Sequence, residues 1–197
     1  MSTSEIMINA WKSGIAIPAF NVPYLPMLEP IVRAATEEDS FVLIEVARLE
    51  WTKFRAESPE TVAVEFQKQM TQHVRLHLDH IPVIDEDSER VDYLEIIKRA
   101  LDCGYQSVMI DGSRLSLDEN IRCAAEAADL AHRAGVPCEA ELGAVMGHES
   151  GPLPSYEDIF TSGKGFTDPG EAARLISETE CDWLSVAVGS IHGAVSG

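Results

Sequence analysis

The chain has 197 residues, enough to bury a substantial core without disulfide staples. Hydrophobic residues make up 45% and charged residues 24% of the sequence, which is too apolar for a disordered protein. With 15 Lys and Arg against 33 Asp and Glu, the formal net charge is −18 at pH 7. Such an acidic surface repels phosphate backbones and anionic lipids, so it argues against nucleic acid and membranes as partners. An anionic substrate would need local help from a metal ion or from oriented backbone N–H groups.

The N-terminal sequence and the cysteines predict a soluble, cytoplasmic protein. The start, MSTSEIMINAWKSG, shows no basic segment followed by an apolar run and a cleavage site. No apolar run approaches the roughly 20 residues that a membrane helix needs. The four cysteines form no CxxC pair, which predicts reduced, buried thiols.

Short β-rich apolar runs alternate with longer amphipathic runs along the chain. The predicted strands cover residues 15–21, 40–47, 73–79, 107–111, 136–142 and 183–189. The predicted helices cover residues 24–38, 92–103, 117–133 and 168–178, which Pro or Asp start signals and Gly stop signals help to place. This alternation favours βα units and a parallel sheet. The near-continuous apolar character of the strands agrees, because both faces of such strands are covered.

Two segments break the alternation. Residues 82–90 (PVIDEDSER) form an acidic loop after the third strand. Residues 143–169 are rich in Gly, Pro and Ser and are too long for a simple connection, so we expect a mobile active-site loop there.

Polar residues occupy the carboxyl ends of the predicted strands, where parallel α/β folds gather functional groups. Two histidines and several carboxylates on one rim indicate a divalent metal site, and imidazole suits zinc. These strand ends are Asn21, His77 to His80, Asp111 to Ser113, Glu139 to Gly143 and Gly189 to Gly193. The candidate site residues among them are Asn21, Asp79, His80, Asp111, Glu141 and His192.

Each of these residues also has a purely structural interpretation. His80 could bond a core carbonyl, Asp79 and Asp111 could serve turns, Glu141 could pair with an arginine, and His192 could sit in a Gly-rich turn. Regular alternation also points Asp79 and His80 to opposite faces, so both reach one site only if the strand ends near Asp79.

Four strings, in this order, closely resemble the class II, zinc-dependent ketose-bisphosphate aldolases, a family that includes fructose-bisphosphate and tagatose-bisphosphate aldolases. They are LHLDH (76–80), SVMIDGS (107–113), EAELGAVMGHE (139–149) and VAVGSIHG (186–193). The resemblance implies a TIM (β/α)8 barrel. It also implies reversible aldol cleavage of a ketose (bis)phosphate to dihydroxyacetone phosphate and an aldehyde such as glyceraldehyde 3-phosphate.

The predicted strand starts lie on average about 34 residues apart, so eight units need roughly 270 residues, near the ~250 of a typical barrel. We therefore expect residues 1–197 to form a single aldolase-type barrel domain, incomplete at its C-terminus, with about six of the eight βα units.

The resemblance implies a role for each matching residue. His80 and His192 correspond to zinc ligands, and Asp79 to the group that polarises or protonates the aldehyde oxygen. Glu149 corresponds to the base that removes a proton from dihydroxyacetone phosphate.

Other positions match the rest of the site. Asp111 and Glu141 correspond to an alternative metal position, Gly193 to a backbone contact with phosphate, and Asn21 to a substrate-binding residue. The implied cofactor is Zn²⁺, with Co²⁺ or another divalent ion as alternatives and a monovalent cation assisting. The implied partners are a phosphorylated sugar and further copies of the chain, in a homodimer or homotetramer.

Three features depart from the family pattern. Members carry a third zinc-binding His on the seventh strand, and these 197 residues do not include it. Ala47 stands where many members have a Ser that binds phosphate, and the connection from Asp79 to Asp111 is longer and more acidic. The first two features support a second hypothesis, a non-catalytic aldolase-like protein that binds a metal or a phosphosugar. A phosphate-handling isomerase barrel is a third, which the paired HLDH and GSIHG motifs disfavour.

Overall fold

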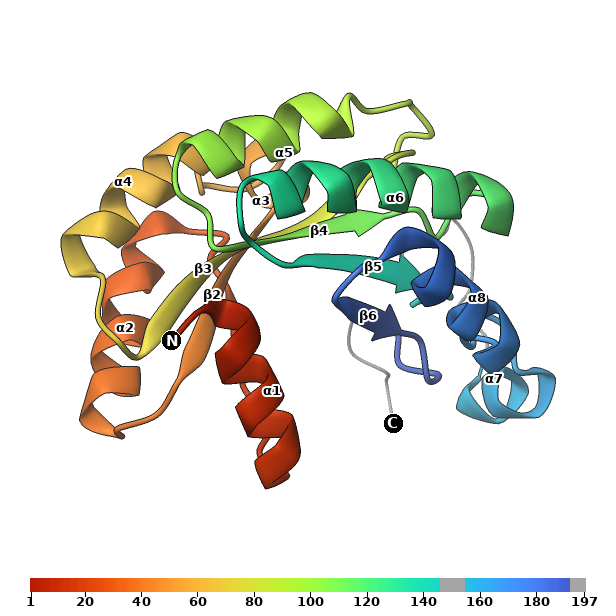
Figure 1. Cartoon of the computed structure of the whole chain (residues 1–197), viewed down its shortest axis with the longest axis horizontal. Coiled ribbons are helices and arrows are strands. Elements are labelled where there is room, and N and C mark those ends of the chain that lie inside the picture. The colour runs from red at the N-terminus through yellow and green to blue at the C-terminus, as the bar shows by residue number, and fades with distance from the viewer. Residues whose placement is uncertain (146–154, 192–197) are drawn as a thin grey trace.

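A computed structural model describes residues 1–145 and 155–191 and places six parallel strands in one curled sheet (Figure 1). Neighbouring strands pair in sequence order from β1 to β6, as βα units require. The strands are β1 (Ala19–Asn21), β2 (Val42–Ala47), β3 (Val74–Pro82), β4 (Ser107–Asp111), β5 (Cys138–Leu142) and β6 (Trp183–Val186). The predicted parallel sheet is confirmed.

Most helices connect successive strands and cover the convex side of the sheet, whereas the first helix precedes β1 and lies apart from them (Figure 1). They are α1 (Thr3–Ser13), the 3₁₀ turn η1 (Leu25–Met27), α2 (Leu28–Glu37), α3 (Arg48–Thr52), α4 (Pro59–Gln69), α5 (Tyr93–Asp102), α6 (Leu117–Arg133), α7 (Tyr156–Ser162) and α8 (Pro169–Thr179). In the described ranges, no helix is long and apolar enough to span a membrane.

Most predicted elements appear with shifted ends, and the shifts have local causes. The first strand begins at Ala19 rather than residue 15 because Pro18 has no N–H to donate to a ladder. The sixth ends at Val186, and Gly189 then turns the chain with φ +92°. The predictions for β4 and α6 match the observed bounds.

Four helices were not predicted, although cap signals mark three of them. In α1, Ser2 and Glu5 form a capping box and Gly14 closes the helix in the left-handed conformation. Ser58 caps α4 directly before Pro59, while α3 is a single short turn after β2.

The fourth unpredicted helix, α7, lies inside the segment predicted to be a mobile active-site loop, and Ser155 caps it. The described part of that segment is therefore partly helical. Residues 146–154 lie outside the described residues, and the mobility of the segment stays a prediction.

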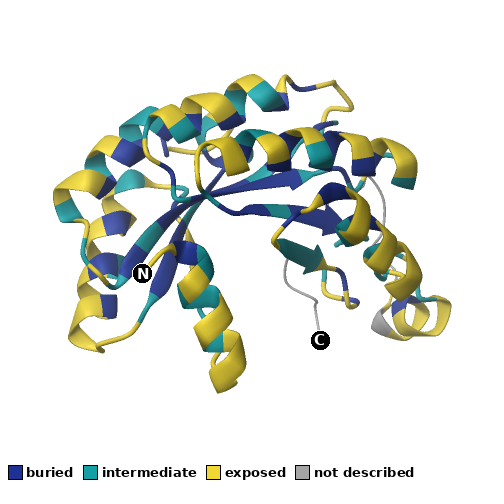
Figure 2. Cartoon of the chain, viewed as in Figure 1, coloured by how far each residue is buried: buried dark blue, intermediate teal, exposed yellow. Residues whose placement is uncertain are grey.

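The main apolar core lies between the convex face of the sheet and the helices. Alternate residues of β2 and β3, such as Ile44, Leu76 and Leu78, belong to one buried cluster with α6 residues such as Ala124. Figure 2 shows these strands as the most buried part of the chain. The intervening residues are largely polar from β2 to β5, so these strands alternate more than we expected and the concave face is polar.

The cysteine prediction is confirmed in most respects. Cys123, Cys138 and Cys181 are buried, Cys103 is partly exposed, and all four are free thiols.

Leu76→Ala tests the position of the core, because Leu76 is 1% exposed and packs on the convex face. We expect it to lower the free energy of unfolding by about 2–5 kcal/mol, through lost burial and the cavity left behind. Urea denaturation measures this loss. Trp11→Ala serves as the control, because Trp11 is exposed and should change stability by about 0.5 kcal/mol or less. Equal effects of the two substitutions would contradict this placement.

Candidate metal and substrate site

A one-residue bulge near the end of β3 places Asp79 and His80. Leu78 pairs with Val108 and Ile81 with Ile110, so β3 has one more residue than β4 in this stretch. His80 adopts φ +41°, a left-handed conformation that is costly for a residue with a Cβ. The strand continues to Pro82, so the expectation that it ends near Asp79 is wrong. The bulge, instead of a strand end, breaks the alternation of the two side chains.

The His80 ring lies against two carboxylates from the next two strands. Its Nδ1 is 3.1 Å from Glu141 Oε2 and 3.7 Å from Asp111 Oδ2. One ligand atom from each residue lies within 4.8 Å of the others. Glu141 is nearly buried while His80 is 41% exposed, so the group is open on the histidine side. We call these three residues the His80 group.

Electrostatics in the His80 group favour a positive charge. Burial lowers the pKa of His80, but the Asp111 and Glu141 carboxylates and Asp79 outweigh it and raise the pKa to about 12. Burial alone would raise the pKa of Asp111, but His80 and Ser113 hold it below its usual value. The imidazolium proton thus occupies the place that a cation would take.

A divalent metal ion fits the same atoms. Glu141 Oε2 is buried and makes no well-aligned hydrogen bond with another described residue. One imidazole and two carboxylates are a donor set that zinc, manganese and iron accept. The metal would replace the proton on His80, since a ligating histidine is neutral.

Asn21 and Asp79 form the second part of the site. Asn21 Nδ2 donates a hydrogen bond to Asp79 Oδ2 at 2.8 Å, joining the end of β1 to the bulged part of β3. The strand between β1 and β3 is β2, and its last residue, Ala47, is the register partner of Asp79. The Ala47 N–H donates to Glu50 Oε2 at 2.8 Å. Burial raises the pKa of Glu50 to about 7, although this backbone hydrogen bond lowers it.

Five predicted site residues therefore meet at the carboxyl edge of the sheet: Asn21, Asp79, His80, Asp111 and Glu141. The other three, Glu149, His192 and Gly193, lie outside the described residues, and their roles stay predictions.

The structure distinguishes between a site role and a purely structural role for three of these residues. Asp111 has the predicted turn role as well, because its Oδ1 accepts from the Ser113 N–H at 2.9 Å. Glu141 contacts His80 rather than an arginine, and His80 faces carboxylates rather than a core carbonyl.

A second polar cluster lies on the concave face and was not predicted. It contains Glu45, His77 and Asp79, with Glu139 beside them. Burial lowers the pKa of His77 to about 4, so the ring is neutral. Burial raises the pKa of Glu45 to about 8 and of Glu139 to about 7. The sequence does contain a signal for this cluster, because polar residues occupy alternate positions of β3. Such residues are rare in a strand that is buried on both faces.

Basic residues at the rim hold the acidic loop 82–90. Arg48 pairs with Asp85 at 3.3 Å, and Lys53 pairs with Glu86 at 2.8 Å. Arg114 Nη1 donates to the Asp85 carbonyl at 2.7 Å. Basic residues that follow β2 and β4 thus bind the acidic loop and pair with Asp85 and Glu86.

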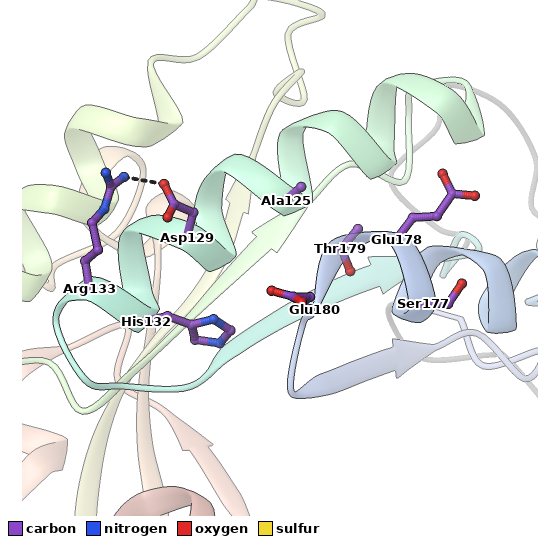
Figure 3. A pocket seen from close by; sticks show the side chains of 8 residues that line it. All are labelled: Ala125, Asp129, His132, Arg133, Ser177, Glu178, Thr179 and Glu180. Carbon is purple, nitrogen blue, oxygen red and sulfur yellow. Dashed lines mark ion pairs between the residues drawn. The ribbon is translucent and has the colours of Figure 1, made fainter.

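A surface pocket between α6 and α8 is separate from this site (Figure 3). His132 and Arg133 line it from the end of α6, just before β5. Glu180 lines it from the end of α8, just before β6. The pocket therefore lies toward the amino ends of these strands. Because barrel enzymes act at the carboxyl ends, we assign no function to it. Its lining comprises Ala125, Asp129, His132, Arg133, Ser177, Glu178, Thr179 and Glu180.

Comparison with known proteins agrees with this geometry. The sequence profile described as "Fructose-bisphosphate aldolase class-II" matches residues 1–197. A probable fructose-bisphosphate aldolase of Bacillus subtilis is 32% identical over 200 residues, which cover all of this chain and 64% of that protein. A fructose-bisphosphate aldolase of Staphylococcus epidermidis is 31% identical with the same coverage. The chain thus spans about 64% of the length of these curated relatives.

Solved structures support the predicted fold. The YdjI aldolase from Escherichia coli K12 matches with a TM-score of 0.73 and 31% identity, over 96% of this chain and 62% of that one. A putative fructose-1,6-bisphosphate aldolase from Coccidioides immitis matches with a TM-score of 0.72 and 29% identity, over 98% of this chain and 62% of that one. The six strands correspond to part of an aldolase TIM barrel, which confirms the predicted fold class.

Gly112→Ala tests the packing beneath the His80 group. A Cβ at Gly112 would overlap the side-chain oxygen of Asn120, whose Nδ2 donates to the Glu141 carbonyl at 2.9 Å. We expect a loss of about 1–3 kcal/mol in unfolding free energy, because the buried Asn120 must move. Thermal unfolding measures the loss. Gly170→Ala in α8 is the control. Its Cβ would lie 3.1 Å from Asp168 Oδ1, an exposed side chain that has to shift by only a few tenths of an ångström, so we expect a clearly smaller loss than for Gly112→Ala. A neutral Gly112→Ala would contradict this packing.

Proposed function

Because this chain belongs to the class-II fructose-bisphosphate aldolase family, we propose that it supplies the core of a metal-dependent aldolase site that cleaves or forms a ketose phosphate. The observation that carries the proposal is the His80 group at the same sheet edge as the Asn21–Asp79 hydrogen bond. A metal-binding group and a positioned acid are the two parts that an aldol reaction without a Schiff base requires.

We assign the binding roles by chemistry. A divalent ion held by His80, with His192 or with Asp111 and Glu141, would supply a Lewis acid for the charge that develops when a ketone loses its α-proton. We propose Zn²⁺, with Co²⁺ as a substitute and a monovalent cation assisting. The backbone of Gly193 is proposed to contact the phosphate. Positive charge from the metal would offset the acidic surface, which otherwise repels a phosphorylated sugar.

The proton-transfer roles fall on two carboxyl groups. Asp79 is proposed to hold or donate a proton at the aldehyde oxygen, and Asn21 fixes its orientation through the 2.8 Å hydrogen bond. Glu149 is proposed to remove the α-proton from dihydroxyacetone phosphate. A positioned carboxylate base typically contributes 10²–10⁴-fold to the rate.

The aldehyde side of the site supports a substrate that differs from fructose bisphosphate. Ala47 offers a methyl group where many family members carry a Ser hydroxyl, and its N–H is already bonded to Glu50. Neither group is then free to bind a second phosphate. Cleavage to dihydroxyacetone phosphate and glyceraldehyde 3-phosphate is the reference reaction, and a ketose with one phosphate is an equal candidate. We further propose a cytoplasmic homodimer or homotetramer.

The same Ala47 observation favours one alternative function, a non-catalytic aldolase-like protein that binds a metal or a phosphosugar. Isothermal titration with dihydroxyacetone phosphate, beside a cleavage assay with several ketose phosphates, separates the two. Binding without any cleavage supports the alternative, and turnover of any of the ketose phosphates excludes it.

Removal of metal tests the reaction class. Chelation should abolish carbon–carbon cleavage, and Zn²⁺ or Co²⁺ should restore it, because the developing negative charge needs a Lewis acid. Borohydride added with the substrate should leave the activity unchanged, since no lysine forms a Schiff base. Cleavage that survives thorough chelation, or loss of activity on borohydride trapping, contradicts a metal-dependent mechanism.

Glu149→Ala tests the assigned base. It should slow exchange of the α-proton of dihydroxyacetone phosphate by about 10²–10⁴-fold, as expected for loss of a positioned base. Exchange in deuterated water, followed by NMR, gives the rate. The affinity for Co²⁺ should change little, because Glu149 is not among the proposed ligands. Glu157→Ala is a control on the first turn of α7. An unchanged exchange rate in Glu149→Ala would remove this residue from its role.

A further inference from the structure

A second set of ligand-type side chains lies on the concave face, one layer below the His80 group. Glu45 on β2 and His77 on β3 are direct neighbours in the sheet register, and Asp79 follows two residues later on the same face. One ligand atom from each of the three lies within 4.8 Å of the others. We call these residues the His77 group.

The His77 ring has one free nitrogen inside this group. The side chain is fully buried, and its Nδ1 forms a 2.8 Å hydrogen bond with Ser107 Oγ. The Nε2 atom has no hydrogen-bond partner among the described residues. Glu139 Oε2 is the nearest carboxylate to it, at 3.7 Å, which is too long for a hydrogen bond. A buried nitrogen in a structure is normally paired, so this atom needs an explanation.

The hydrogen bond with Ser107 sets which tautomer a metal would find. If Nδ1–H donates to the serine oxygen, the Nε2 lone pair is free and points away from Ser107. This is the neutral tautomer in which histidine binds metals, with its other nitrogen fixed by a neighbouring group. Ser107 thus orients His77 as a supporting residue orients a metal ligand.

The acidic groups around the ring outnumber the basic ones. Glu45, Asp79 and Glu139 bring carboxylates toward His77. In ranges 1–145 and 155–191, the ion pairs of lysine and arginine involve other acidic residues. Arg75, on the same face of β3, donates instead to the carbonyls of Val74 and Met1. No lysine or arginine in these ranges therefore balances the three acidic groups. Burial raises the pKa of Glu45 and Glu139 and the positive His80 partly lowers it, but the His80 ring lies against Asp111 and Glu141.

We propose that the His77 group is a second divalent cation site, with Glu45 and His77 as ligands and Glu139 able to complete the shell, while Asp79 beside them keeps its proposed role at the aldehyde oxygen. One imidazole nitrogen with carboxylate oxygens suits Zn²⁺, Mn²⁺ or Fe²⁺ better than Mg²⁺ or Ca²⁺, which prefer oxygen alone. Glu45 is only partly buried, which leaves an approach from the concave side. The site goes beyond the proposed function, because occupancy of these residues does not require aldol cleavage.

Metal stoichiometry tests the proposal on the purified full chain. After removal of metal, equilibrium dialysis against Co²⁺ followed by elemental analysis should give two ions per chain. His77→Gln should give one, since glutamine can still bond Ser107 but offers no imidazole. His80→Gln should also give one, through loss of the other site. His132→Gln is the matched control, because this histidine pairs with Asp182 away from both groups, and it should retain both ions.

Glu45→Gln gives a second, independent variant should His77→Gln fail to fold. It should weaken binding of the second Co²⁺ by about 10- to 100-fold or more, since loss of a residue that merely supports a ligand already costs that much, while the circular dichroism spectrum stays native. The proposal is overturned if the wild-type chain binds one ion that only His80→Gln removes, or if both ions persist in Glu45→Gln and His77→Gln. Loss of cleavage with two ions still bound would count against the proposed function alone, so the two hypotheses fail separately.

Discussion

The bulge in β3 is the constraint on which the site depends. Leu78 and Ile81 are both fully buried in the structure, although residues three apart on a regular strand face opposite sides. The extra residue lets both apolar side chains reach the buried side, and it leaves His80 free to turn toward Asp111 and Glu141. A left-handed backbone at a non-glycine residue costs about 1–2 kcal/mol. The burial of two large apolar side chains offsets that cost, at about 1.5–3 kcal/mol each. Packing of Leu78 and Ile81 in the core therefore keeps the His80 side chain in its position beside Asp111 and Glu141.

The same division of the sheet accounts for the unusual polarity of the strands. The convex face carries the apolar residues that pack on the helices, so the concave face is free to hold titratable groups. Burial then raises the pKa of Glu45 and Glu139 and lowers that of His77, because a low-dielectric interior disfavours charge. His80, which is more exposed than His77, instead gains positive charge from its carboxylate neighbours. The acidic side chains of the concave face thus surround two histidines and favour a bound cation there.

The sequence was informative where local patterns decide the structure. The positions of all six strands and the bounds of α6 follow from apolar runs and cap residues. The polar strand ends located Asn21, Asp79 and Asp111 at one edge because parallel strands share their carboxyl ends. The bulge could not be predicted, since LHLDHIP contains no glycine and the register depends on contacts with β4. The pairing of Glu45 with His77 was missed for the same reason, since residues from separate strands meet only once the register is fixed.

The end of β2 shows how a small local change alters the rim. With Ala at position 47, the backbone N–H is bonded by the buried Glu50, and the following residue, Arg48, extends to Asp85 in the acidic loop. Arg114 holds the same loop through the Asp85 carbonyl. Two arginines are thereby committed to an internal partner at the rim, where a second phosphate would otherwise find cationic donors. The methyl group of Ala47 and the contacts of Arg48 and Arg114 therefore leave this part of the rim with few free donors for an anion.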